Sequence, residues 1–201
     1  MPLIVFEGID GCGKTTQADL LCNRLAQRRQ AFHRLREPGT TALGEATRRI
    51  LLDPATTASP TAELFAYLMA RAQLCDEVLR PALAGGELVI LDRFWYSTIA
   101  YQAFGLGLSE ELVRAANRLA VGELACDLAL WFDVEPQRAV QRRTAVTPDR
   151  IEARGLEYLG RVRAGYQSLC ARQELRRIDA QRPMAEISDE VWALVHPLLR
   201  S

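Results

Sequence analysis

The chain has 201 residues, of which 49% are hydrophobic, and this length suits one α/β domain, residues 1–201, with a sizeable core. Its 25 Lys and Arg residues equal its 25 Asp and Glu residues, which excludes the broad positive field of a nucleic-acid-binding surface. We therefore expect small-molecule ligands and no nucleic-acid polymer. Five scattered cysteines, and no apolar run near the ~18 residues of a membrane span, predict a cytoplasmic protein that does not enter a membrane.

The first feature along the chain is an apolar run, residues 3–6, followed by a glycine-rich stretch and a helix-like sequence. The stretch reads FEGIDGCGKTT and fills the Walker A pattern, whose backbone N–H groups surround phosphate oxygens and whose lysine contacts the β- and γ-phosphates. The positive end of the following helix would point at the same phosphates. The predicted ATP site comprises Gly8, Ile9, Asp10, Gly11, Cys12, Gly13, Lys14, Thr15 and Thr16. Within it, Lys14 is also predicted to be catalytic, and the hydroxyl of Thr15 is also predicted to bind Mg²⁺.

Apolar runs and helical patterns alternate along the rest of the chain. Further strands are predicted at residues 31–36, 88–91, 128–132 and 175–178. Helices are predicted after residue 14, over 41–53, 61–84, 95–103 and 109–119, from 136, over 152–172 and from 183. The helix after Thr41 carries one apolar stripe, made of Leu43, Ala46, Ile50 and Leu51. This alternation after a Walker loop predicts a P-loop NTPase fold, a three-layer α/β/α structure with a five-stranded parallel sheet.

In such a sheet, ligands bind at the carboxyl ends of the strands. The rule gathers charged residues from distant parts of the chain onto one rim, namely Asp10, Arg36, Glu37, Asp92, Arg93 and Asp133. Arg36 and Arg93 would clamp an acceptor phosphate while Lys14 reaches the donor, because phosphoryl transfer needs cations around the migrating group. Asp92 follows a buried strand and is interpreted either as a second Mg²⁺ ligand or as the N-cap of the next helix.

Three arginines, Arg142, Arg143 and Arg150, flank a break in the helical pattern at residues 144–148. They predict a lid over about residues 142–152 that closes over both phosphates. The plain alternative is a solvated helix face.

Two pairs of side chains share helical faces and could meet one ligand. Tyr67 and Arg71 are four residues apart, which would bring an aromatic ring and a hydrogen-bonding fork to the same base. The alternative puts Tyr67 in the core and leaves Arg71 with only its charged head in solvent. Ser97 and Tyr101 are likewise one turn apart, with Gln102 adjacent.

Taken together, these residues resemble the thymidylate kinase family along nearly the whole chain. The motifs that carry the resemblance are EGIDGCGKTT at 7–16, REPG at 36–39, RAQ at 71–73, DRF at 92–94, STIAYQ at 97–102, DRIE at 149–152, RVR at 161–163 with Tyr166, and IDA at 178–180. The resemblance implies ATP-dependent, Mg²⁺-requiring phosphorylation of dTMP to dTDP in dTTP biosynthesis, by a homodimeric enzyme.

The resemblance also implies a role for each matching residue. Tyr67 stands at the position of a base-stacking aromatic, Arg71 at that of a thymine-reading arginine, and Tyr101 beside the sugar 2′ position. The implied substrate-binding residues are Asp10, Arg36, Pro38, Arg48, Tyr67, Arg71, Arg93, Ser97, Tyr101 and Gln102. Gly11 occupies the loop position where some members carry a catalytic arginine. The predicted catalytic set is therefore Lys14, Arg93, Arg143 and Arg150.

Three departures from the family pattern bear on the acceptor. Thr40 stands where many bacterial members have glycine, residues 103–107 lack an arginine that is common there, and the lid has fewer arginines than that of some relatives. They keep open a kinase for another or a modified pyrimidine nucleotide. A non-metabolic P-loop switch protein is a further alternative, but a GTPase switch needs an Asn-Lys-x-Asp motif, which this sequence does not contain.

Overall fold

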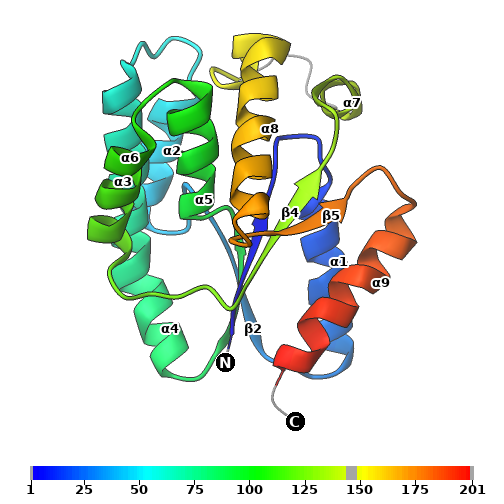
Figure 1. Ribbon diagram of the computed structural model, residues 1–201. Coiled ribbons are helices and arrows are strands. Elements are labelled where there is room, and N and C mark those ends of the chain that lie inside the picture. Colours follow the sequence, from blue (N-terminus) through cyan, green and yellow to red (C-terminus); the bar gives the residue numbers. More distant parts are fainter. Residues whose placement is uncertain (1, 144–148, 200–201) are drawn as a thin grey trace.

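The computed structural model describes residues 2–143 and 149–199. Its sheet has five parallel strands in the order β2-β3-β1-β4-β5, which confirms the predicted architecture. The strands are β1 (Leu3–Glu7), β2 (Phe32–Arg36), β3 (Leu88–Asp92), β4 (Leu128–Asp133) and β5 (Arg176–Asp179). Figure 1 shows helices on both faces of this sheet, with α1 and α9 on one side and α3, α6 and α8 on the other.

The nine α-helices described by the structure follow the predicted order. They are α1 (Lys14–Gln27), α2 (Ala42–Leu52), α3 (Pro60–Leu74), α4 (Arg80–Ala84), α5 (Trp95–Thr98), α6 (Glu110–Val121), α7 (Pro136–Arg142), α8 (Gly155–Ala171) and α9 (Met184–Val195). Wider π-helical turns, η1 (Cys75–Leu79) and η2 (Ile99–Gly105), continue α3 and α5, and short 3₁₀ turns occur at η3 (Glu152–Arg154) and η4 (His196–Leu198). The predicted helix over 152–172 therefore begins its α-helical part at Gly155, whose φ of +82° interrupts the turn before it.

The central strands form the core and fix the position of the loops at their carboxyl ends. Residues 3–6 and 88–91 have no exposed surface, and the Phe6 and Phe132 rings stack at 5.3 Å between centroids. Phe6 pairs with Asp92 across β1 and β3, and the Arg93 N–H donates to the Phe6 carbonyl at 2.9 Å. This register puts the Walker loop, which follows β1, directly beside the Asp92–Arg93 turn.

The predicted apolar stripe of α2 is only partly buried, since Leu51 lies in the core but Leu43 and Ile50 do not. Thr41 caps the helix as expected, because its Oγ1 accepts the Gly44 N–H at 3.0 Å. The buried positions, however, are Gly44, Thr47 and Leu51, whereas Leu43 is 40% and Ile50 58% exposed. Glycine is required at 44, since a Cβ there would lie 2.4 Å from the Gly39 carbonyl oxygen. The close approach of the 39–41 loop thus turns Leu43 and Ile50 outward.

Candidate active site

The Walker loop between β1 and α1 depends on backbone conformations that glycine favours. Gly8, Gly11 and Gly13 have φ angles of +142°, +87° and +90°. A Cβ at Gly11 would also lie 2.1 Å from the Ala139 carbonyl oxygen of α7. No side chain fits at position 11, so this chain cannot place an arginine there.

Asp10 joins two cations at the centre of the site. Its Oδ1 accepts from Lys14 Nζ at 2.9 Å and from Arg93 Nη2 at 2.8 Å. Burial alone would raise the pKa of Asp10, but the charges of Lys14 and Arg93 outweigh burial and hold it well below its usual range. Asp10 is therefore ionised, and it fixes both cations before a phosphate arrives.

Thr15 and Asp92 meet at the predicted metal position. Thr15 Oγ1 donates to Asp92 Oδ2 at 3.2 Å, while Asp92 Oδ1 is buried and has no hydrogen-bond partner among the described residues. Within residues 2–143 and 149–199, no cluster of three or more His, Cys, Asp or Glu side chains offers a metal cage. Mg²⁺ usually keeps several waters and takes only one or two protein oxygens. An unpaired carboxylate oxygen beside a hydroxyl fits that requirement.

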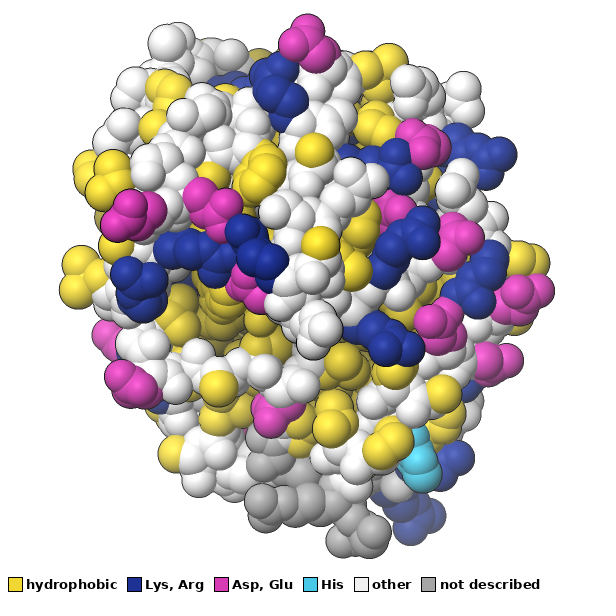
Figure 2. All heavy atoms as spheres, viewed as in Figure 1, with side chains coloured by type: hydrophobic (Ala, Val, Ile, Leu, Met, Phe, Trp, Pro, Cys, Tyr) yellow, Lys and Arg dark blue, Asp and Glu magenta, His cyan; other side chains and the backbone are white. Residues whose placement is uncertain are grey.

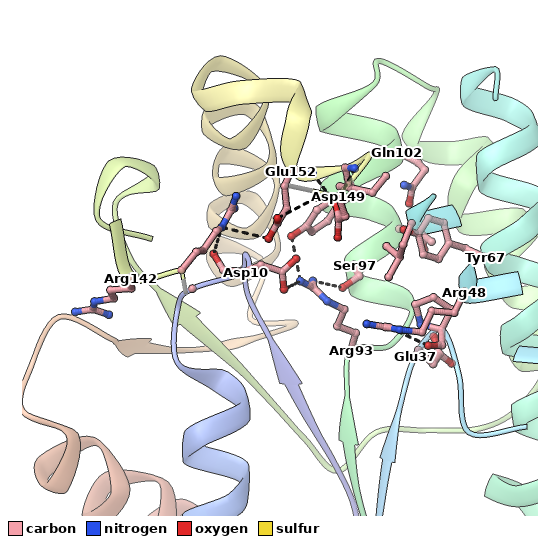
Figure 3. Close-up of a pocket in the computed structure, with 17 residues that line it drawn as sticks. Asp10, Glu37, Arg48, Tyr67, Arg93, Ser97, Gln102, Arg142, Asp149 and Glu152 are labelled. Atoms are coloured by element: carbon pink, nitrogen blue, oxygen red, sulfur yellow. Dashed lines mark hydrogen bonds and ion pairs between the residues drawn. The ribbon is translucent and has the colours of Figure 1, made fainter. Parts of the chain in front are cut away.

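Two pockets share the rim of the sheet. The first, of about 430 Å³, is lined by eight of the ten predicted substrate residues, namely Asp10, Pro38, Arg48, Tyr67, Arg93, Ser97, Tyr101 and Gln102. The second, of about 580 Å³, is lined by Lys14, Thr15, Arg36 and Asp92 among others. Asp10, Glu37, Arg48 and Arg93 line both. Figure 3 shows Arg93 between Asp10 and Ser97, with Tyr67 across the first pocket. A charged rim therefore separates two adjoining compartments.

A third pocket, of about 290 Å³, lies on the other side of the Walker loop. It is lined by Cys12, Gly13, Thr16, Gln17, Arg142, Ala180, Arg182, Met184 and Ile187. Figure 3 shows Arg142 pointing away from Arg93, and its Nη1 donates to the Ala180 carbonyl at 2.9 Å. The Walker loop thus has a compartment on each side.

Comparison with known proteins assigns this arrangement to a family. The sequence profile described as thymidylate kinase matches residues 6–191. The chain is 42% identical over 196 residues to a thymidylate kinase of Synechococcus sp. (strain CC9311), covering 94% of this chain and 92% of that protein. It is 43% identical over 201 residues to a thymidylate kinase of Gloeobacter violaceus (strain ATCC 29082 / PCC 7421), covering 98% and 95% of the two chains.

The chain belongs to the thymidylate kinase family. A third relative, a thymidylate kinase of Desulforudis audaxviator (strain MP104C), is 42% identical over 203 residues and covers 98% of this chain and 91% of its own. The predicted resemblance is confirmed, and so is the predicted fold class.

Arg71, which the resemblance predicted to read the base, does not line the first pocket. Its side chain is 1% exposed, and its guanidinium donates to Glu37 Oε2 at 2.8 Å, to Asn117 Oδ1 at 2.6 Å and to the Phe94 carbonyl at 3.1 Å. Two partners of Arg71 line the first pocket, namely Glu37 and Thr98, and Thr98 Oγ1 lies 3.2 Å from Arg71 Nη1. Arg71 therefore lies in the wall behind the pocket, and its role in binding the base stays a prediction.

Two other predicted rim residues, Arg36 and Asp133, do not line the first pocket. Arg36 lines only the second pocket, where its Nη2 pairs with Glu45 at 2.9 Å. Asp133 is buried between Arg163 and Arg177, both at 2.7 Å, and lines none of the three pockets. Asp133 ends β4 at the rim, as predicted, but its carboxylate pairs with arginines of α8 and β5 and does not face a pocket.

The arginines of the predicted lid separate into different environments. Residues 144–148 lie outside the described residues. Arg143 lines the first pocket, where its Nε lies 3.4 Å from the Asp10 carbonyl and 3.4 Å from Glu152 Oε1. Arg150 does not line it, since its guanidinium pairs with buried Glu63 at 2.7 Å and donates to the Leu51 carbonyl at 2.8 Å. Of the two lid arginines predicted to be catalytic, only Arg143 lines the first pocket in this structure, and their catalytic roles stay predictions.

Several pocket residues were missed as site residues at the sequence level. They are Leu52, Thr98, Asp149, Ile151 and Glu152 in the first pocket, and Gln17, Ala180, Arg182, Met184 and Ile187 in the third. A signal existed for some of them, because DRIE and IDA are family motifs. Gln17 Nε2 donates to the Met184 carbonyl at 3.0 Å. These two residues are 167 positions apart, so no local sequence pattern could have predicted the contact.

Thr40 adopts the backbone conformation that glycine would supply at this position. Its φ is +71°, in the left-handed region that β-branched residues rarely enter. Two hydrogen bonds hold it there, from its N–H to Glu45 Oε1 at 2.9 Å and from its hydroxyl to the Arg36 carbonyl at 3.1 Å. The loop after β2 thus keeps its left-handed residue without the glycine.

Proposed function

We propose that this chain transfers the γ-phosphoryl group of ATP to dTMP, giving dTDP and ADP. The observation that carries the proposal is the shared rim. One compartment holds the Walker lysine, the adjoining one holds an aromatic ring and polar side chains, and the Arg93 and Asp10 pair lies between them. Phosphoryl transfer needs a donor and an acceptor held in line across a cationic boundary, since its catalysis is mostly positioning and charge stabilisation.

The donor side is formed by the Walker loop and its flanks. Backbone N–H groups of residues 11–16 and the ammonium of Lys14 hold the β- and γ-phosphates. Thr15 and the unpaired oxygen of Asp92 would hold Mg²⁺, which, when bound, neutralises charge on the phosphate oxygens. We assign the third pocket to the nucleoside of ATP, with Arg142 and Arg182 on its walls.

The acceptor side is formed by residues of α3, α5 and η2. Arg93 holds the acceptor phosphate, because its guanidinium is already oriented by Asp10 at 2.8 Å, Ser97 at 3.3 Å and Tyr101 at 3.2 Å. An oxygen of that phosphate attacks the γ-phosphorus, the new P–O bond forms, and the bond to ADP breaks. Tyr67 offers an aromatic face to the base, and Gln102 lines the same pocket.

The decisive experiment measures ADP release in a coupled assay with dTMP, dUMP, dCMP, UMP and 5-substituted dUMP as acceptors. We expect the highest kcat/KM with dTMP and no turnover above background without an acceptor. If another pyrimidine nucleotide gives a higher kcat/KM, that nucleotide is the preferred acceptor in place of dTMP, and the reaction is still phosphoryl transfer to a nucleotide. ATP hydrolysis that no acceptor accelerates would contradict the kinase assignment.

We also propose that the enzyme is a homodimer built through α2, α3 and α6. Large hydrophobic side chains on these neighbouring helices are exposed, namely Leu43 (40%), Ile50 (58%), Phe65 (61%), Met69 (46%), Leu112 (69%) and Leu119 (89%). Figure 2 shows hydrophobic side chains at the surface on the side where these helices lie. A second copy offers the same apolar face, and a two-fold contact would cover both at once.

Two further assignments concern the chain as a whole. We infer that residues 1–201 act as one kinase domain and that the enzyme works in the cytoplasm. All five cysteines are free, which supports a reducing compartment. Among the described residues, no helix is both long and apolar enough to cross a membrane.

A further inference from the structure

Glu7 is a buried carboxylate that lines none of the three pockets. It is the last residue of β1 and has no exposed surface. It accepts three hydrogen bonds, from the Phe94 N–H at 2.8 Å, from Ser97 Oγ at 2.6 Å and from the Tyr166 hydroxyl at 2.8 Å. Burial raises the pKa of Glu7, against the lowering effects of the Arg93 charge and of these hydrogen bonds. Two segments that are distant from β1 in the sequence therefore meet on one side chain.

The backbone turn beside Glu7 is strained and is held from both sides. Arg93 has a φ of +69°, in the left-handed region that residues with a Cβ rarely adopt. The next residue, Phe94, donates its N–H to Glu7 Oε1 at 2.8 Å, and its carbonyl accepts from Arg71 Nη2 at 3.1 Å. Two buried charged side chains thus fix the peptide groups that follow Arg93.

A second link runs from Glu7 to the guanidinium of Arg93. Ser97 Oγ donates to Glu7 Oε2 and accepts from Arg93 Nη1 at 3.3 Å, and it also lies 3.1 Å from the Tyr166 hydroxyl. The Ser97 hydroxyl has one hydrogen to donate, and it donates that hydrogen to Glu7. A lone pair of the Ser97 oxygen is therefore left to accept from Arg93. Glu7 therefore constrains the backbone through Phe94 and the side chain through Ser97.

We propose that Glu7 is a positioning residue that holds Arg93 in the orientation needed for the acceptor phosphate. The inference rests on the proposed function, because that function assigns Arg93 to this phosphate. Glu7 itself contacts neither nucleotide in this scheme. It acts before binding, since an arginine that is already fixed loses less freedom when its phosphate arrives.

A double-mutant cycle tests the proposal through the acceptor kinetics. We expect Glu7→Gln to lower kcat/KM for dTMP by about 10- to 100-fold, the loss that a displaced catalytic group can cause, with the KM for ATP unchanged. Glu7→Gln added to Arg93→Ala should change kcat/KM by less than about two-fold, because Glu7 acts only through Arg93. Equal losses from Glu7→Gln with and without Arg93 would overturn the proposal.

Two further variants separate positioning from folding. Asp127→Asn is the matched control, because Asp127 Oδ2 also accepts a backbone N–H of β1, that of Leu3 at 2.8 Å, at the opposite end of the strand. It should leave dTMP kinetics unchanged. If Glu7→Gln does not fold, Tyr166→Phe decides, since it removes one hydrogen bond from Glu7. We expect it to lower kcat/KM for dTMP in the Arg93 background and not in the Arg93→Ala background.

The outcomes distinguish this inference from the proposed function. If the wild-type chain prefers an acceptor other than dTMP, the same cycle is measured with that acceptor, and Glu7 is judged on it. If the wild type uses dTMP and neither Glu7→Gln nor Tyr166→Phe alters acceptor kinetics, the positioning role is refuted while the kinase assignment stands.

Discussion

Lys14 is the only lysine in a chain that otherwise carries its positive side-chain charge on arginine. It lies at the start of α1 with its side chain 7% exposed and bound to Asp10. The compact ammonium suits this enclosed position, whereas a planar guanidinium needs more room and a different hydrogen-bond geometry. The residue type at this position therefore matters beyond its charge.

We predict that Lys14→Ala and Lys14→Arg both abolish turnover while the fold is retained. Alanine removes the cation from the donor phosphates, and arginine keeps the charge but does not fit the enclosed site. Steady-state ADP release, with circular dichroism as the check on folding, measures both. Activity near wild type in Lys14→Arg would show that charge alone suffices.

At the metal position, we predict that Asp92→Asn raises the Mg²⁺ concentration needed for half-maximal turnover. The amide removes the charge of the carboxylate whose Oδ1 has no partner among the described residues. EDTA should stop turnover of the wild type, and added Mg²⁺ should restore it. If the Mg²⁺ titration of Asp92→Asn is identical to that of the wild type, Asp92 accepts the Thr15 hydrogen bond but does not bind Mg²⁺.

The site residues that could be predicted from sequence are those whose function depends on local geometry. The Walker loop and the residues directly after β3 take their position from strand, turn and helix order, which the pattern of apolar residues reveals. Arg71 and Arg150 could not be placed, because their positions depend on buried Glu37 and Glu63, which are distant in sequence. Helical spacing puts residues on one face and does not say which partner they find there.

Among the elements, the segment that follows residue 148 is tied to α3 by a buried charge cluster. Glu63, which has no exposed surface, pairs with Arg150 at 2.7 Å and with Arg154 at 2.5 Å, and accepts from Gln102 Nε2 at 3.0 Å. Burial opposes ionisation of Glu63, but its arginine and glutamine partners outweigh burial and lower the pKa of this carboxyl. The cluster joins α3, η2 and η3 beside the acceptor pocket.

We predict different kinetic effects for Arg143 and Arg150. Arg143→Ala should lower the single-turnover rate by about 10³-fold, since Arg143 lines the pocket and position 11 cannot supply an arginine. Arg150→Ala should chiefly raise the KM for dTMP, because it loosens the wall that Glu63 holds. Single-turnover measurements are needed, since slow product release can mask a defect in the chemical step.

The control for this comparison is Arg138→Ala. Arg138 lies on α7, is exposed, and lines none of the three pockets described above. Arg142 is unsuitable, because it lines two pockets. A single-turnover defect in Arg150→Ala as large as that in Arg143→Ala would show that Arg150 leaves Glu63 during the reaction.

The order and type of nearly all strands and helices could be predicted. The direction in which the apolar side chains of α2 point could not. Buried strands such as residues 88–91 are continuous apolar runs, and α2 was located by its cap at Thr41. The exposure of Leu43 and Ile50 was not predictable. A hydrophobic stripe on a helix has the same sequence pattern whether it packs in the core of its own chain or against another molecule. For the whole molecule these exposed side chains matter because they form part of the proposed dimer face.

Helix α3 connects the proposed dimer face to the acceptor pocket. Phe65 and Met69 are four residues apart and exposed, whereas Tyr67 and Glu63 point to the pocket and to the buried cluster. At 100° per residue, Phe65 and Tyr67 lie on opposite sides of the helix. Packing against a second copy would therefore restrain the helix whose other side lines the pocket proposed for the base.

The last prediction tests this connection. We expect the wild type to have about twice the chain mass of 22.5 kDa by light scattering, and Phe65→Asp and Leu119→Glu to have the mass of one chain. Each charge would have to be buried without a partner in the dimer. Leu156→Glu is the control, since Leu156 is 45% exposed on α8, away from this face. The monomeric variants should also show a raised KM for dTMP and an unchanged KM for ATP, because α3 lines only the acceptor side. Monomers with wild-type acceptor kinetics would separate dimerisation from the pocket, and a monomeric wild type would refute the dimer.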